Sequence, residues 1–296
     1  MAFRPITDSP SIAIVTPSFN QAPFLEAAIR SVLDQEYPAL EYVVMDGGSS
    51  DGSAEIIRRH ETRLSWTSER DGGQYAAVAD GFSRTRGEIL GWLNSDDAYT
   101  PWAFSIVAEI FAQFAEIEWL TTTRPLFWDA RGRVIRCEAI NGFSTSGFFA
   151  GEYLPGSSGF GLGCIQQEST FWRRSLWERA GGFDPDFPLA GDFALWARFF
   201  EHAELFAVNV PLAGFRTHGM QKTAADFARY IKEAAKALRK YGGRPRGVMW
   251  RVIRELARRA PAVCWPALAA VGWMHGAKLV TQDPRRGGWT IEERFI

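Results

Sequence analysis

The sequence predicts an α/β fold, in which helices flank a mainly parallel sheet. Short apolar runs, which are typical of buried strands, alternate with segments whose apolar residues recur at helical spacing. Several of these apolar runs end in loops rich in Gly and Asp, as strands do at the carboxyl edge of a parallel sheet. The helical segments between them supply the right-handed crossovers that parallel pairing requires.

The N-terminal elements follow from these patterns. Residues 12–15 form an apolar run that Thr16 and Pro17 stop, and residues 24–33 carry apolar side chains at helical spacing. In chain order we expect a strand at 12–15, a helix at 24–33, a strand at 42–45, a helix at 53–59, a weaker strand at 64–66, a helix at 75–85 and a strand at 89–93.

The later part of the chain changes character. We expect strands at 119–123 and 134–136 around a turn at 129–132, helices at 173–180 and 193–201, a strand at 205–208, and helices from residue 224 onward. Residues 141–164 are rich in Gly, Ser and Phe without clear periodicity, which is typical of a binding loop.

Composition narrows the class of protein. The chain has 296 residues, 46% hydrophobic and 23% charged, as in an ordinary globular protein, and its net charge of -1 gives no support for a nucleic-acid partner. Its three cysteines are widely spaced and odd in number, which favours a reducing compartment. The first residues lack the apolar core of a signal peptide, so we expect a cytoplasmic protein.

The C-terminal region allows two interpretations. Residues 250–259 alternate apolar and arginine side chains, and residues 260–274 are apolar, with two tryptophans and two prolines. This apolar stretch is too short for a membrane span, but a basic helix beside it is suited to peripheral contact with an anionic membrane. The alternative is a helical appendage packed on the main body of the protein.

Carboxylates gather at the predicted carboxyl edge of the sheet. Asp96 and Asp97 follow the apolar run at residues 89–93, Asp46 ends the second strand, and Asp71 lies in a Gly-flanked loop. Adjacent carboxylates at such an edge suit Mg²⁺ or Mn²⁺, which is held by one or two carboxylates together with substrate phosphates. Neither the G-x-G-x-x-G nor the G-x-x-x-x-G-K-[ST] motif occurs, so those modes of nucleotide binding are not supported.

These motifs resemble, in the same order, those of family 2 glycosyltransferases, which have the GT-A fold. The resemblance runs over roughly residues 10 to 220 and is specific because its motifs are many and correctly ordered. It is carried by residues 14–20, 46–52, 71–74, Gly81, Gly87 and 93–97, and then by residues 167–173, 181–184 and 191–198.

The resemblance implies a GT-A-type, Rossmann-like fold with a C-terminal helical extension. The catalytic domain would be residues 1–223, with a nucleotide-sugar-binding half at 10–100 and an acceptor-binding half at 101–223. Residues 224–296 would form the C-terminal helical region.

The resemblance also implies the site residues. The donor nucleotide would lie against Thr16, Pro17, Asn20, Asp46, Asp71, Gly72, Gln74, Asn94 and Asp96. Asp96, Asp97 and His218 would bind the metal, and Asp192 would be the catalytic base. Asn94 replaces the first Asp of the commoner Asp-x-Asp form, so the sequence leaves open which of Asp96 and Asp97 touches the metal.

The acceptor side is expected at residues 141–171. Gln167, Phe171 and Trp172 are either contacts for a hydroxylated ligand or, for the two aromatic residues, part of the core.

The function implied is a metal-dependent, inverting glycosyltransferase. It would move a sugar from a nucleoside-diphosphate donor, expected to be a UDP-sugar, to a hydroxyl of a carbohydrate or lipid-linked acceptor in glycan or cell-surface polysaccharide biosynthesis. A base and a metal site on opposite sides of the anomeric carbon predict a single displacement. Two alternatives stay open: a nucleotidyltransferase, which the absence of Lys and Arg from residues 16–24 disfavours, and an inactive nucleotide- or sugar-binding module.

Overall fold

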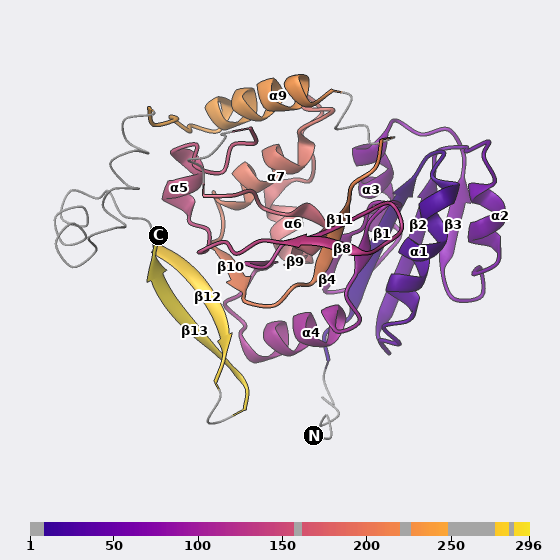
Figure 1. The fold of residues 1–296 in the computed structure, drawn as a ribbon, viewed down its shortest axis with the longest axis horizontal. Coiled ribbons are helices and arrows are strands. Elements are labelled where there is room, and N and C mark those ends of the chain that lie inside the picture. The colour runs from indigo at the N-terminus through magenta and orange to yellow at the C-terminus, as the bar shows by residue number, and fades with distance from the viewer. Residues whose placement is uncertain (1–8, 157–161, 220–225, 248–275, 284–286) are drawn as a thin grey trace.

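The computed structural model describes residues 9–156, 162–219, 226–247, 276–283 and 287–296 (Figure 1). Within them, a nine-stranded sheet has the order β13-β12-β10-β6-β9-β4-β1-β2-β3. Its strands are β1 (Ile12–Ser18), β2 (Leu40–Asp46), β3 (Ser65–Ser68), β4 (Ile89–Trp92), β6 (Trp119–Thr122), β9 (Phe171–Arg173), β10 (Leu205–Val208), β12 (Gly276–Gln282) and β13 (Trp289–Phe295).

Most neighbours in this sheet run parallel. The exceptions are β9, which lies antiparallel between β4 and β6, and β13, which is antiparallel to β12. The prediction of an α/β fold with a mainly parallel sheet is therefore confirmed. Because β1, β2, β3 and β4 are parallel, their carboxyl ends lie at one edge of the sheet.

Helices cover both faces of the sheet and divide the core into two layers. One layer packs α1 (Ala22–Leu33) and α4 (Ala103–Gln113) against Ile12 and Ile14 of β1, and the other packs α3 (Gln74–Ser83) and α7 (Gly191–Phe199) against Ala13 and Val15. Successive strand residues point to opposite faces, so β1, which is buried along its whole length, contributes to both layers. The other helices are α2 (Ser53–Arg58), α5 (Thr145–Phe149), α6 (Arg174–Ala180) and α9 (Phe227–Lys240), with a 3₁₀ turn, η1, at Gln167–Ser169.

A second, four-stranded sheet lies beside the carboxyl edge of β4. Its order is β5-β11-β7-β8, formed by β5 (Ala98–Tyr99), β11 (Ala213–Arg216), β7 (Leu126–Trp128) and β8 (Val134–Cys137). In this sheet β5, which begins directly after Asp97, pairs antiparallel with β11, which ends shortly before His218. The pairing therefore brings these two parts of the chain together.

Phe171 and Trp172 belong to the core and are fully buried in β9. They have no surface on which a ligand could stack, so the core interpretation of these two residues is correct.

The C-terminal region is only partly helical. Helix α9 agrees with the expectation, but residues 276–282 and 289–295 form strands that extend the main sheet, where we had expected helix. Their side chains alternate at the period of a strand, with Leu279 in one core layer and Val280 in the other. The basic and apolar segments at residues 250–274 lie outside the described residues.

In the described part of the chain, no helix combines the length and apolar character needed to cross a bilayer.

Candidate active site

Asp46 lies at the carboxyl end of β2, between the ends of β1 and β3. Its carboxylate accepts hydrogen bonds from the backbone N–H of Ser49 at 3.0 Å, the Ser49 hydroxyl at 2.5 Å and the Ser68 hydroxyl at 2.6 Å. These bonds fix a buried carboxylate at the sheet edge, as the sequence predicts for a nucleoside contact.

The loop after β1 is tied to the loop after β2. Asn20 has a φ of 52°, a conformation that Asn tolerates better than most residues. Its N–H donates to the Ser49 hydroxyl at 2.8 Å, and its side-chain oxygen accepts from the N–H of Ser50 at 2.9 Å. Asn20 therefore shapes the rim of the site.

Phe19 and Asp71 meet over Gly47. A Cβ on Gly47 would lie 3.1 Å from Asp71 Oδ2 and 3.3 Å from a ring carbon of Phe19. Phe19 is 61% exposed, which is unusual for an aromatic side chain at a strand end. The sequence reasoning missed Phe19; its signal was a large aromatic residue directly after a strand within a predicted site. Its open ring face suits a nucleobase.

Thr16 and Pro17 are buried within β1. The Thr16 hydroxyl is 3.0 Å from the Tyr42 hydroxyl inside the core. The structure therefore gives Thr16 a supporting position behind the site rather than a surface toward a ligand.

Helix α3 begins at the site. The Asp71 carboxylate accepts from the N–H of Gly73 at 2.7 Å, and Gly72 is exposed beside it. Gln74, the first residue of α3, donates from its amide to Asn94 Oδ1 at 2.7 Å. This contact links the loop that carries Asp71 to residues 94–97, here called the acidic loop.

Asn94 is a hydrogen-bond hub in the acidic loop. Its oxygen accepts from Gln74 and from the Trp92 indole at 3.2 Å, while its NH₂ group donates to Asp97 at 3.3 Å and to Gln167 at 3.1 Å. A carboxylate at this position could not donate these last two bonds. The departure from the commoner family motif is therefore matched to its surroundings in this chain.

The two aspartates of the acidic loop have different environments. Asp97 is 1% exposed and accepts from the N–H of Arg216 at 2.8 Å. Burial raises the pKa of Asp97, and the charges of Asp96 and Glu168 raise it further. The Asp96 side chain is 17% exposed, and its Oδ2 lies 3.0 Å from His218 Nε2. Asp96 is thus the more accessible of the two.

Asp96 and His218 fit a divalent cation as a donor pair. Asp96 contributes a carboxylate oxygen, the kind of ligand that Mn²⁺ and Mg²⁺ favour, and His218 contributes an imidazole nitrogen. The His218 ring is stacked on Phe24 with centroids 4.2 Å apart, so its orientation is fixed. Among the described residues, no group of three His, Cys, Asp or Glu side chains is assembled for a metal.

Asp192 lies in the first turn of α7 between two tyrosines. Its Oδ1 is 3.3 Å from the Tyr75 hydroxyl and its Oδ2 is 3.0 Å from the Tyr230 hydroxyl. Burial raises the pKa of Asp192, while bonds from the backbone N–H of Phe193 and from the two hydroxyls oppose that rise. A carboxylate with a raised pKa is better matched to accept a proton near neutral pH.

The start of α3 brings the acidic loop and Asp192 together. Gln74 donates to Asn94, and the hydroxyl of the next residue, Tyr75, donates to the Leu189 carbonyl oxygen at 2.8 Å and lies 3.3 Å from Asp192 Oδ1. Two consecutive residues thus connect the predicted metal side of the site to the predicted base.

Glu168 is a site residue that the sequence reasoning did not select. It is 3% exposed in η1, and its Oε1 has no hydrogen-bond partner. Burial raises its pKa to about 8, and the charges of Asp96 and Asp192 contribute to the rise. Glu168 therefore lies within electrostatic reach of both halves of the site. The signal that could have found it was an acid three residues before a buried strand.

Comparison with known proteins finds similarity to glycosyltransferases. The glycosyl transferase family 2 model matches residues 13–124. An uncharacterised glycosyltransferase of Mycobacterium tuberculosis is 28% identical over 223 residues, which cover 73% of this chain and 78% of the relative.

Solved structures share the fold at low sequence identity. TarS residues 1–349 from S. aureus, in complex with UDP-GlcNAc, gives a TM-score of 0.58 at 12% identity, covering 88% of this chain and 75% of that one. The mannosyltransferase PcManGT from Pyrobaculum calidifontis, in complex with GDP-Man and Mn²⁺, gives a TM-score of 0.57 at 20% identity. The match covers 90% of this chain and 77% of that one. In a longer TarS structure the match spans only 39% of that chain. The family model and the curated relative support a family 2 glycosyltransferase, and the solved structures share its GT-A-type fold.

Proposed function

We propose that this protein transfers a sugar, with inversion, from a nucleoside-diphosphate donor to a hydroxyl group of a glycan acceptor. The observation that carries the proposal is the pair of contacts from Gln74 to Asn94 and from Tyr75 to Asp192. They support a site in which the start of α3 contacts both the proposed base and the acidic loop.

Asp192 is the proposed general base. As the acceptor oxygen attacks the anomeric carbon, Asp192 takes the hydroxyl proton, and the bond from that carbon to the diphosphate oxygen breaks. One displacement on the face opposite to the leaving group inverts the configuration at this carbon. The diphosphate leaves with the electron pair of the broken bond.

Asp96 and His218 are the proposed metal ligands, with Asp97 holding the acidic loop in place through Arg216. When bound, Mn²⁺ or Mg²⁺ would offset negative charge on the diphosphate. Asp96 rather than Asp97 is the proposed direct ligand because its carboxylate is the more accessible.

Phe19, Asp46 and Asp71 are the proposed nucleoside contacts. Phe19 offers a ring face to the base, and the two carboxylates can accept hydrogen bonds from the base or the ribose. A UDP-sugar is the proposed donor. The fold is shared both with a UDP-GlcNAc complex and with a GDP-Man complex, so the test includes both nucleotides.

The test is a calorimetric titration of the full chain with UDP, GDP and CDP, each with and without Mn²⁺. We expect UDP to bind and its affinity to depend on Mn²⁺. Preference for GDP would change the donor class but keep the transferase proposal. If folded protein bound none of the three, the transferase proposal would be wrong. If one bound but its sugar derivatives were neither transferred nor hydrolysed, the inactive binding module would be the better interpretation.

A further inference from the structure

We infer that the outward face of helix α9 is a docking surface for the anionic headgroups of a membrane. Three cations form the centre of this surface and two more flank it, and together we call them the basic stripe. They are Lys232, Lys236 and Arg239 at the centre, with Arg229 and Lys240 at the ends. The inference goes beyond the proposed function and does not depend on it, since it concerns the place where the protein binds and no step of the reaction.

The spacing of the cations along α9 places the basic stripe on one side of the helix. Lys232, Lys236 and Arg239 are four and three residues apart, the spacing at which helical side chains share a face. All three are exposed, whereas the opposite side of α9 is buried through Ala234 and Leu238. Figure 1 shows α9 at the periphery of the molecule, outside α7. The basic stripe therefore points away from the main body of the protein.

The charge at the centre of the basic stripe is not neutralised within the described part of the chain. At its ends, Arg229 pairs with Glu233 at 3.3 Å and Lys240 pairs with Asp184 at 2.6 Å. The three central cations form no ion pair with any carboxylate of the described residues. A row of exposed, unpaired cations attracts an anionic surface, and the attraction weakens as salt is added.

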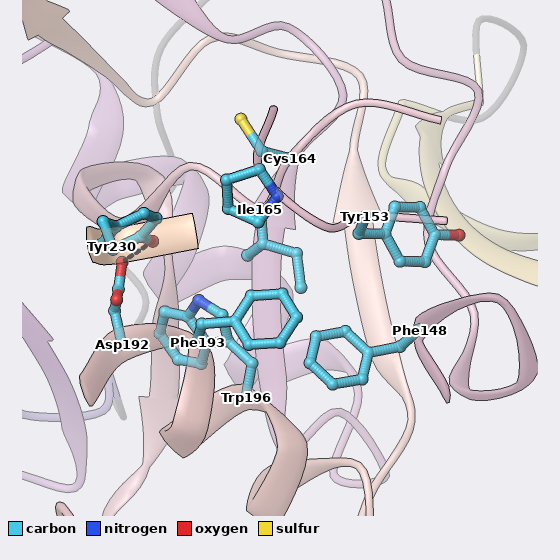
Figure 2. A pocket seen from close by; sticks show the side chains of 9 residues that line it. Phe148, Tyr153, Cys164, Ile165, Asp192, Phe193, Trp196 and Tyr230 are labelled. Carbon is cyan, nitrogen blue, oxygen red and sulfur yellow. Dashed lines mark hydrogen bonds between the residues drawn. The ribbon is translucent and has the colours of Figure 1, made fainter. Parts of the chain in front are cut away.

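Helix α9 is fixed to the element that carries Asp192, so the basic stripe has a fixed direction. The Glu233 carboxylate accepts from the N–H groups of Leu189 and Ala190, directly before α7, at 2.9 and 3.2 Å. On the packed side of α9, the Tyr230 hydroxyl donates to Asp192 at 3.0 Å, as Figure 2 shows. A membrane on the basic stripe would therefore lie across a single helix from the proposed base.

The sequence concentrates positive charge in this part of the chain. Residues 226–259 contain 11 of the 33 Lys and Arg residues but only 3 of the 34 Asp and Glu residues. Because the whole chain has a net charge of -1, the remainder is acidic. Such a separation of charge directs one side of a protein toward an anionic surface and keeps the other side away from it.

The residues that follow α9 in the sequence favour a membrane over a soluble polyanion as the partner. Arg251, Arg254 and Arg258 continue the helical spacing of cations, and residues 260–274 are apolar with two tryptophans. A soluble polyanion would need only the cations, whereas stable attachment to a membrane takes a second signal besides a basic patch. Because the side chains of the basic stripe are all charged, it would contact headgroups without entering the acyl layer.

The experiment measures co-sedimentation of the full chain, without nucleotide, with lipid vesicles. One set of vesicles is phosphatidylcholine alone, and the other contains about 30% phosphatidylglycerol to supply anionic headgroups. Both are tested at about 0.1 M and about 0.5 M NaCl, because salt screens electrostatic attraction. Binding to heparin measures attachment to a soluble polyanion.

Two triple variants each lose three positive charges. The stripe variant combines Lys232→Gln, Lys236→Gln and Arg239→Gln. The control variant neutralises three exposed cations on α1, on α2 and in the chain before β4: Arg30→Gln, Arg58→Gln and Arg86→Gln. Melting temperatures and calorimetric nucleotide affinities of both variants should match the wild type, because all six side chains are exposed.

We expect the wild type to sediment with the anionic vesicles and not with phosphatidylcholine alone, and to be released by high salt. A cation near an anionic membrane strengthens binding roughly fivefold, so the stripe variant should bind the anionic vesicles roughly 100-fold more weakly. The control variant should bind almost as the wild type does, because its lost charges lie on other elements and would not contact the membrane.

Equal affinity of the two variants for anionic vesicles would overturn the inference. Equal binding of the wild type to both kinds of vesicle would also contradict it, since headgroup charge would then not matter. Failure of the wild type to bind anionic vesicles would do the same, and binding to heparin alone would identify a soluble polyanion as the partner. None of these results bears on the proposed function, which nucleotide binding tests separately.

Discussion

The acidic side chains of the site differ mainly in how deeply they are buried. Asp71 is exposed and Asp96 is partly exposed, whereas Asp97 and Glu168 are buried. Exposed carboxylates can meet a ligand at little cost, while buried ones resist ionisation unless they are hydrogen-bonded. The same residue type is therefore suited to ligand binding in one place and to support in another.

Asp192→Asn should abolish most transfer while leaving nucleotide binding intact. An amide cannot take the acceptor proton, and loss of a general base lowers rates by about 10²- to 10⁴-fold. Donor turnover and nucleotide affinity measure the two effects. Asp186→Asn is the control, because Asp186 is an exposed carboxylate paired with Lys240. Turnover by Asp192→Asn at the wild-type rate would show that another group is the base.

Glu168→Gln should stabilise the protein increasingly as the pH rises. The pKa of Glu168 is about 8 in the folded protein, against an ordinary value of 4.5, so folding favours its protonated form. The stability that this proton contributes is complete below pH 4.5 and is lost as the pH rises toward 8. Glutamine carries no such penalty.

The measurement is the melting temperature of both proteins from pH 5 to 8, with a chelator present to exclude metal. The difference between variant and wild type should grow with pH. A difference that stays constant would mean that Glu168 ionises normally in the folded protein.

At the scale of elements, β11 positions the residues proposed for the metal side of the site. It pairs with β5 and β7 and carries Arg216, which lies two residues before His218. Gly214 allows this strand to pass close to Trp128, since a Cβ there would lie 1.6 Å from the indole nitrogen. The absence of a side chain at residue 214 thus allows β11 to lie directly against Trp128.

Gly214→Ala should therefore displace β11, lower stability by about 1–3 kcal/mol and weaken Mn²⁺-dependent nucleotide binding. Gly219→Ala is a matched control, because a Cβ on Gly219 meets nothing within 4 Å. Thermal melting and calorimetry with and without Mn²⁺ are the measurements. Equal Mn²⁺-dependent nucleotide affinity in the two variants would show that the position of β11 does not affect the metal site.

Local sequence patterns were sufficient for the elements that hold the donor side. The predicted strands at 12–15, 42–45 and 89–93 consist almost entirely of apolar residues, and Asp46 and the acidic loop directly follow the second and the third of them. Tyr230 could not be found this way, because its partner Asp192 is 38 residues away and no local motif marks it. Strand β12 was missed because its pairing with β10 joins residues about 70 positions apart.

At the scale of the whole molecule, the two ends of the described chain lie in one sheet. β1 is near one side and the hairpin of β12 and β13 forms the opposite edge (Figure 1). This hairpin contributes Leu279 to one core layer and Val280 and Trp289 to the other. The C-terminal strands are therefore part of the main body of the protein.

Deletion of residues 276–296 should make the protein insoluble or prone to self-association. It would expose the edge of β10 and remove apolar side chains from both core layers. Soluble yield and gel filtration measure the outcome. Val280→Ala, which keeps the strand, should cost only about 1–3 kcal/mol and remain soluble. A monomeric, fully folded deletion variant would show that the hairpin is dispensable.

The place of the C-terminal hairpin has a consequence for residues 248–275. Helix α9 precedes them and β12 follows them, and both are fixed to the main body. These residues are therefore connected at both ends to parts of the chain that are fixed to the main body. A segment joined to the folded body at one end lets that body rotate relative to whatever the segment contacts, whereas a segment joined at both ends restricts this rotation. If these residues contact a membrane, the active site would face that membrane within a restricted range of angles.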